Sequence, residues 1–171
     1  MREYLLGIDP GVRTGIAVVS GGELVRCFAL ELLPQSAKPG ALLWLLQHAR
    51  HFGAAVIEDA TALGIYARHR RLNREERDAV ARSVGEVDLA TKLLTAILEA
   101  EGVLVLREPP QRRKKWDAAR LEELTGWTHP TCHHARDAAR LIVGESVHTV
   151  RRRLASQRSS VTASRQPATV S

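Results

Sequence analysis

The sequence predicts an α/β fold in which a mixed five-stranded sheet is flanked by helices. Hydrophobic residues make up 44% of the 171 residues but aromatic residues only 4%, so aliphatic side chains must fill the core, which favours a sheet covered by helices. The patterns follow the order three strands, helix, strand, helix, strand and further helices. This order predicts three antiparallel strands followed by two parallel additions, with the first strand beside the fourth.

The first 32 residues predict an antiparallel meander. Apolar runs at Tyr4–Ile8 and Gly15–Val19 flank the turn Asp9-Pro10-Gly11, because Pro and Gly end strands in turns. Gly21-Gly22 marks a second tight turn, after which the alternation over Glu23–Leu32 predicts the third strand.

The remaining elements follow from periodicity and from the positions of glycine and proline. They are a helix at Ala41–Phe52, a strand at Ala54–Ile57, a long helix at Arg74–Glu101, a strand at Val103–Leu106, a short helix at Trp116–Leu124 and a last helix from His133 to about Arg153. Gly53 is expected to end the first helix in a left-handed cap. Residues 1–150 are expected to form one domain, and 151–171 a basic, Ser-rich and disordered tail.

Much of the net charge of +6 lies at the C-terminal end. Residues 151–171 hold five Arg and no acid, and subtracting these five charges leaves +1 for residues 1–150. Two basic clusters in the body, Arg68–Arg71 and Arg112–Lys115, could neutralise phosphates, or could equally be ordinary solvated faces.

Cysteine content and hydropathy indicate a cytoplasmic protein. Cys27 and Cys132 are far apart and have no paired spacing, so a reducing compartment is the simpler inference. The start of the chain has neither the length nor the flanks of a signal peptide. No apolar stretch approaches the roughly 18 residues of a membrane span, so no membrane association is expected.

Two acids follow two separate apolar strands. Asp9 ends the run Leu5–Ile8, and Glu58 ends the run Ala54–Ile57. If these strands are adjacent and parallel, the two carboxylates lie side by side, and their repulsion favours a bridging divalent cation. The alternatives are a turn-forming role for Asp9 and a position in the first turn of a helix for Glu58, but both acids ending apolar strands would then be a coincidence.

The start of the last predicted helix offers a third acid. His134 and Asp137 are three residues apart and therefore share one helix face. Small neighbours such as Ala135 and Ala138 would let that helix approach the strand ends closely. The alternatives are a surface pair of His134 with Asp137 and a zinc site that includes Cys132, for which adjacent helical residues point in unsuitable directions.

In order and spacing, these residues resemble the RuvC family of Holliday-junction resolvases, over about residues 5 to 143. The matching motifs are Gly7-Ile8-Asp9-Pro10-Gly11 with Thr14-Gly15-Ile16-Ala17, then Ile57-Glu58, then His134-x-x-Asp137-Ala138. The resemblance implies a ribonuclease H-like fold, a homodimer and cleavage of four-way DNA junctions. It also implies two Mg²⁺ or Mn²⁺ ions held by Asp9, Glu58, His134 and Asp137, which would hydrolyse phosphodiesters by the two-metal mechanism.

The resemblance further implies contacts with branched DNA. Lys114 and Lys115 are candidates for the lysine near the scissile phosphate. Candidates for contacts with the junction are Arg68, Arg70 and Arg71, and Tyr66 could stack on a base. A branch-migration motor is a compatible partner that nothing in the sequence specifies.

Dimerisation has a local argument as well. The helix from Arg74 carries more apolar surface than one sheet face needs, and Gly85 permits close approach of a second helix, although all these residues could instead pack on the sheet.

Three other functions share parts of this pattern. A relative that trims ribosomal RNA precursors shares the Asp-x-Gly opening but typically lacks an acid equivalent to Glu58. An actin-like kinase needs two lobes, which 171 residues cannot supply. A non-catalytic protein that binds branched DNA would leave the acids unused.

Overall fold

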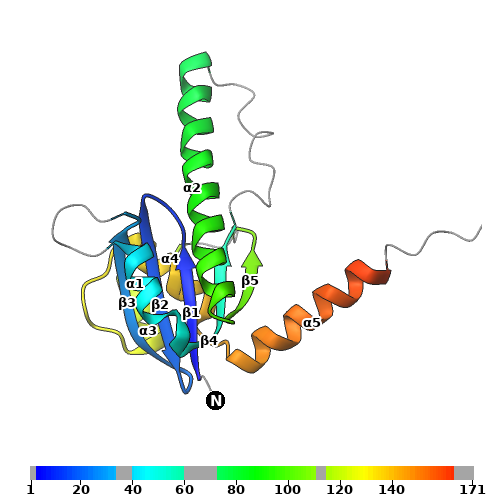
Figure 1. The fold of residues 1–171 in the computed structure, drawn as a ribbon. Helices are drawn as coiled ribbons and strands as arrows, with labels where there is room; N and C mark the ends of the chain where they lie inside the picture. The colour runs from blue at the N-terminus through cyan, green and yellow to red at the C-terminus, as the bar shows by residue number, and fades with distance from the viewer. Residues whose placement is uncertain (1–2, 34–39, 60–72, 111–114, 164–171) are drawn as a thin grey trace, which may run out of the picture.

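The computed structural model describes residues 3–33, 40–59, 73–110 and 115–163, and these form a five-stranded mixed sheet with helices on both faces (Figure 1). The strand order is β3-β2-β1-β4-β5, which confirms the predicted fold class. β1 pairs antiparallel with β2 and parallel with β4, β2 pairs antiparallel with β3, and β5 runs parallel to β4. The strands are β1 Tyr4–Asp9, β2 Arg13–Ser20, β3 Glu23–Glu31, β4 Phe52–Glu58 and β5 Leu104–Glu108.

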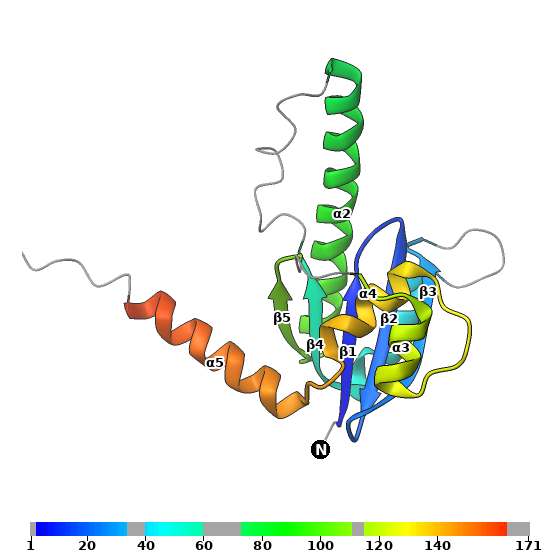
Figure 2. The ribbon, with the colours of Figure 1, turned by 180° about the vertical axis from the view of Figure 1, so that it is seen from behind.

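Helices α1 and α2 cover one face of the sheet, and α3 and α4 cover the other (Figures 1 and 2). On the first face, Leu45 and Leu94 pack with Ile8 and Ile57 in one buried cluster. On the second, Leu5 and Val56 belong to a separate cluster with small residues of α4. The alternation of side chains along each strand supplies both cores. The helices are α1 Ala41–His48, a 3-10 turn at Ala49–His51, α2 Arg74–Ala100, α3 Ala118–Thr125, α4 His133–Ile142 and α5 Val147–Ala163.

Two glycines of the sheet allow α4 to lie directly on the strands. A Cβ atom added at Gly7 would overlap the carbonyl oxygen of Ala138, and one added at Gly15 would overlap the carbonyl oxygen of His134. The backbone of α4 therefore contacts β1 and β2 with no side chain between them. Ala135 and Ala138 are fully buried on the underside of the helix, as their small size predicted.

The first helix is shorter than the sequence predicted, and the expected glycine cap is wrong. α1 ends at His48, and a single 3-10 turn connects it to β4. Gly53 lies inside β4 and is buried, so it serves the strand rather than a helix end. The pattern misled because Phe52, which fits the helical spacing, also starts an apolar strand.

The predicted last helix is in fact two helices. Gly144 has φ +84 and interrupts the chain between α4 and α5, and Ser146 then accepts a hydrogen bond from the backbone N–H of Thr149 at 3.1 Å. This is the geometry of an N-terminal serine cap, which starts a new helix. The expectation of a disordered tail from 151 is also wrong as far as residue 163, because α5 extends to Ala163.

The long helix α2 agrees with its prediction and extends beyond the sheet, past the end at which β1, β4 and β5 finish (Figure 1). It begins with a capping box, in which Asn73 and Glu76 each accept a hydrogen bond from the other's backbone N–H. Its last turns are buried on the sheet through Leu94 and Leu98. None of the described helices is long and apolar enough to cross a membrane.

Candidate active site

The carboxylates of Asp9 and Glu58 leave the sheet at the same end of two adjacent parallel strands. Ile8 is in register with Ile57, so the next residue on each strand carries its acid to the same edge. Asp9 ends β1 and Glu58 ends β4, as the sequence predicted. The strands of a parallel sheet are buried on both faces, so only their ends are close to water. Polar side chains therefore collect at the strand ends.

Helix α4 carries His134 and Asp137 to that edge. Nδ1 of His134 lies 2.9 Å from Oδ2 of Asp9, within hydrogen-bonding distance. Asp137 is buried, and its Oδ2 accepts a hydrogen bond from Nζ of Lys115 at 2.9 Å. The alternative of a surface pair between His134 and Asp137 is therefore wrong, because each of the two has a different partner.

Burial raises the pKa of both strand-end acids. For Asp9, loss of solvation is the main cause and the hydrogen bond with His134 opposes it. For Glu58, loss of solvation is followed by repulsion from Asp9, and Arg140 opposes both. One oxygen of Glu58, Oε2, is buried without a hydrogen bond. The edge thus holds more negative charge than its own surroundings stabilise, which favours an added cation.

Two basic side chains already lie among the acids. One is Lys115, which bonds Asp137. The other is Arg140, whose Nη2 lies 3.7 Å from Oε2 of Glu58 and 3.7 Å from Oδ1 of Asp137. Arg140 thus joins an acid of β4 to an acid of α4.

The residues fit a divalent cation in chemical type. Carboxylate oxygens with one imidazole suit Mg²⁺ and Mn²⁺. In arrangement, no group of three His, Cys, Asp or Glu side chains within the described ranges surrounds one point closely enough to bind an ion as they stand. In this arrangement Asp137 contacts both Lys115 and Arg140, and Arg140 also lies near Glu58. Loading an ion therefore requires that side chains shift.

The predicted zinc alternative finds no support in the described residues. Cys132 is the residue before α4, and Cys27 lies in the core, where its thiol donates a hydrogen bond to the carbonyl oxygen of Ala135. Burial raises the pKa of Cys27 to about 12, so its thiol keeps its proton in the core.

Most of the predicted DNA contacts lie outside the described residues. This holds for Tyr66, Arg68, Arg70, Arg71 and Lys114. Lys115 is described: its side chain is 71% exposed, and its ammonium bonds Asp137.

The sequence reasoning gave no role to Arg140 or to the close glycine contacts. Arg140 follows Asp137 by three residues, so the helical spacing that linked His134 to Asp137 could also have placed Arg140 on that face. The roles of Gly7 and Gly15 depend on which helix crosses the strands, and no local pattern reveals that.

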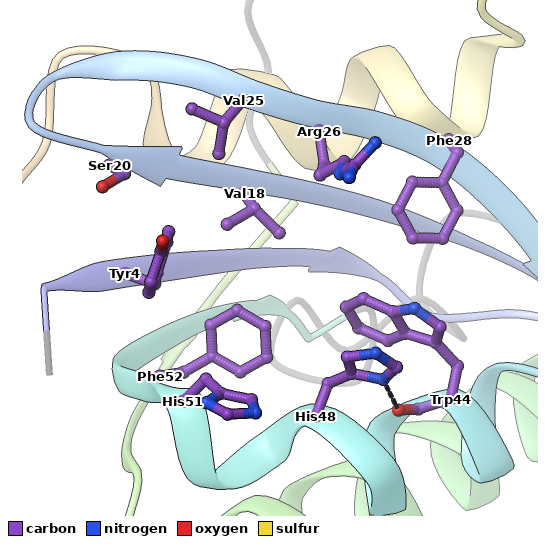
Figure 3. A pocket seen from close by; sticks show the side chains of 10 residues that line it. All are labelled: Tyr4, Val18, Ser20, Val25, Arg26, Phe28, Trp44, His48, His51 and Phe52. Atoms are coloured by element: carbon purple, nitrogen blue, oxygen red, sulfur yellow. Dashed lines mark hydrogen bonds between the residues drawn. The ribbon is translucent and has the colours of Figure 1, made fainter.

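A separate cavity of about 790 Å³ lies at the other end of the sheet (Figure 3). Tyr4 begins β1, Phe52 begins β4 and Ser20 ends β2, so these lining residues mark the end opposite Asp9. Trp44 stacks on His48, whose ring nitrogen lies 2.7 Å from the carbonyl oxygen of Trp44. None of the acids described above lines this cavity.

Comparison with known proteins gives a structural match only. No family model matches the sequence, and no similar curated protein was found. The solved structure of T. thermophilus RuvC in complex with a Holliday junction substrate is similar, with a TM-score of 0.53 and 16% sequence identity. The match covers 89% of this chain and 96% of that chain. Together with the strand order, this likeness shows that the chain has the ribonuclease H-like fold.

Proposed function

We propose that this protein is a divalent-metal-dependent endonuclease that cleaves phosphodiester bonds at four-way DNA junctions. The observation that carries the proposal is the meeting of Asp9, Glu58 and Asp137, from β1, β4 and α4, at one edge of the sheet. We base the proposal on this site because a fold alone does not imply an activity.

Each site residue has a distinct role in this proposal. Asp9 and Glu58, with pKa values raised by burial, would ionise fully and become ligands when a divalent cation is present. When bound, such a cation would supply Lewis acidity, which makes water a better nucleophile and offsets charge on the phosphodiester. His134 orients Asp9 through the 2.9 Å contact. Lys115, released from Asp137, can approach a phosphate oxygen, because its side chain is largely exposed.

Branched DNA is the proposed substrate for two reasons. The similar RuvC structure contains a Holliday junction. The sequence also places a basic cluster with Arg68, Arg70 and Arg71, near Tyr66, in the segment that follows Glu58, and a second with Lys114 and Lys115. Since such DNA lies inside the cell and both described cysteines are free thiols, we place the activity in the cytoplasm.

A homodimer is the proposed assembly, because a two-fold enzyme matches a two-fold junction. On α2, Leu89 and Leu93 are 55% and 40% exposed, so the apolar residues of this helix do not all pack on the sheet. Gly85 has open space around it, which would permit a second helix to approach.

Two other functions are alternatives that an experiment can separate from this proposal. A non-catalytic protein that binds branched DNA would have no need for three acids at one edge of the sheet, two of them with a raised pKa and the third paired with cations. An RNA-processing nuclease of the same fold would not be expected to need Glu58.

A synthetic four-way junction separates these possibilities. With labelled strands and Mg²⁺ or Mn²⁺, we expect paired, symmetric nicks near the exchange point and no reaction in EDTA. Binding without nicks in any metal would favour the non-catalytic protein. Preferential cleavage of a matched RNA stem-loop would favour RNA processing. Linear duplex DNA of the same sequence is the control for selectivity.

A further inference from the structure

The side chain of Arg140 lies between two of the proposed metal ligands. Its Nη2 atom is 3.7 Å from an oxygen of Glu58 and 3.7 Å from an oxygen of Asp137. In a two-metal site, the second metal ion has the role of a cation that bridges two carboxylates. Here that position between Glu58 and Asp137 is taken by a group of the chain itself.

This guanidinium is held in place. The side chain of Arg140 is 5% exposed, against 71% for Lys115. α4 cannot shift away easily, because its backbone rests on Gly7 and Gly15. Arginine also keeps its charge in a protein at any ordinary pH, so deprotonation does not free the position. Lys115, by contrast, can move into solvent when a stronger cation arrives.

The charges of the site agree with one metal ion rather than two. Asp9, Glu58 and Asp137 carry three negative charges when ionised. One divalent cation and the guanidinium of Arg140 balance these three charges, once Lys115 has moved away. A second divalent ion would leave two uncompensated positive charges at a partly buried site, which is unfavourable.

We infer that Arg140 permanently serves as the bridging cation between Glu58 and Asp137, so that each site binds one divalent ion instead of two. This rests on the proposed function, since it assumes that Asp9, Glu58 and Asp137 bind metal. Arg140 is a positioning residue: it fixes the two carboxylates and does not touch the reacting atoms.

Titration of the full-length chain with Mn²⁺ tests the inference without measuring activity. Isothermal titration calorimetry and electron paramagnetic resonance (EPR) of Mn²⁺ give the number of bound ions, and EPR also reports spin coupling between ions about 4 Å apart. We expect one uncoupled Mn²⁺ per wild-type chain. Arg140→Gln is expected to bind two coupled ions, because it frees Glu58 and Asp137. Arg140→Lys keeps the charge and should still bind one.

Arg120→Gln is the control. Arg120 pairs with Glu123 on α3, and neither is one of the proposed site residues, so its loss should leave one ion per chain. Two coupled ions in the wild type would overturn the inference and leave the proposed function standing. A single ion of unchanged affinity in folded Arg140→Gln would also overturn it. Absence of saturable Mn²⁺ binding in the wild type would contradict the proposed function itself. The wild-type measurement decides even if Arg140→Gln does not fold.

Discussion

Nδ1 of His134 lies 2.9 Å from Oδ2 of Asp9, although 125 residues separate them in the chain. The contact exists because α4 crosses β1 and β2 at two glycines, with its backbone against theirs. A larger side chain at either glycine would hold the helix away and separate the two functional groups. The catalytic proposal therefore depends on backbone packing as much as on the acids.

Replacement of Asp9 or Asp137 by Asn should abolish cleavage and preserve junction binding. The amide is a weaker ligand for a hard cation, and metal catalysis contributes several kcal/mol, so we expect a rate loss of about three orders of magnitude or more. Single-turnover cleavage and gel-shift assays in Ca²⁺ measure the two properties. Asp88→Asn removes an acid of similar type, paired with Lys92 on α2, and should cleave normally. Full activity in Asp9→Asn would refute the site.

The metal-free protein should lose stability at the site as the pH rises above 4.5, the ordinary pKa of a glutamic acid. Asp9 and Glu58 have raised pKa values, so the native state binds more protons than the unfolded state, and ionisation costs folding free energy. Asp9→Asn removes this cost and should melt at a higher temperature than the wild type at pH 8 in EDTA, with a smaller difference at pH 4. Mg²⁺ should raise the wild-type midpoint more than that of the variant. Equal midpoints at pH 8 would contradict the raised pKa.

Gly15→Ala should destabilise the fold and impair the site together. Its Cβ would overlap the carbonyl oxygen of His134, so α4 must shift, at a cost of about 1–3 kcal/mol in the free energy of unfolding. Gly85→Ala is the contrasting variant: its Cβ would meet nothing within its own chain, and alanine there should stabilise the single chain by up to about 1 kcal/mol. Urea denaturation measures both. A neutral effect of Gly15→Ala would show that α4 does not rest on the sheet.

Changing Leu89 and Leu93 to Glu should convert a dimer into a monomer. Both leucines are exposed on α2, and charges there cannot be buried in an interface without a large penalty. Sedimentation velocity measures the assembly. Leu43 and Leu46, exposed on α1, are the matched pair, and their change to Glu should leave the assembly unaltered. If the wild type is a monomer at high concentration, the dimer proposal is wrong.

The arginines of α5 should divide into two functions. Arg151 and Arg152 are exposed, and if they contact phosphates, changing both to Gln should lower the slope of log affinity against log salt by about 1.8. Arg153 instead bonds Glu108 on β5, so Arg153→Gln should lower stability and leave the salt slope unchanged. Fluorescence anisotropy with labelled junction DNA at several salt concentrations distinguishes them. Equal slopes for all three proteins would exclude α5 from DNA binding.

The sequence alone determined the class of fold and the four candidate residues. Apolar runs of five or so residues, closed by Pro or Gly, define strands locally, and an acid at the end of a run is visible without any structure. The order of elements then fixes that β1 lies beside β4, because crossover connections between parallel strands have one hand.

Only the tertiary structure decided what surrounds those acids. The break at Gly144, the strand role of Gly53 and the helical course of residues 151–163 depended on capping and packing that compete with local periodicity. Two of the contacts of the acids, Arg140 with Glu58 and His134 with Asp9, join elements more than eighty residues apart. Such contacts arise when a helix docks on a sheet, and the docking geometry is set by close packing between surfaces rather than by any pattern within one segment.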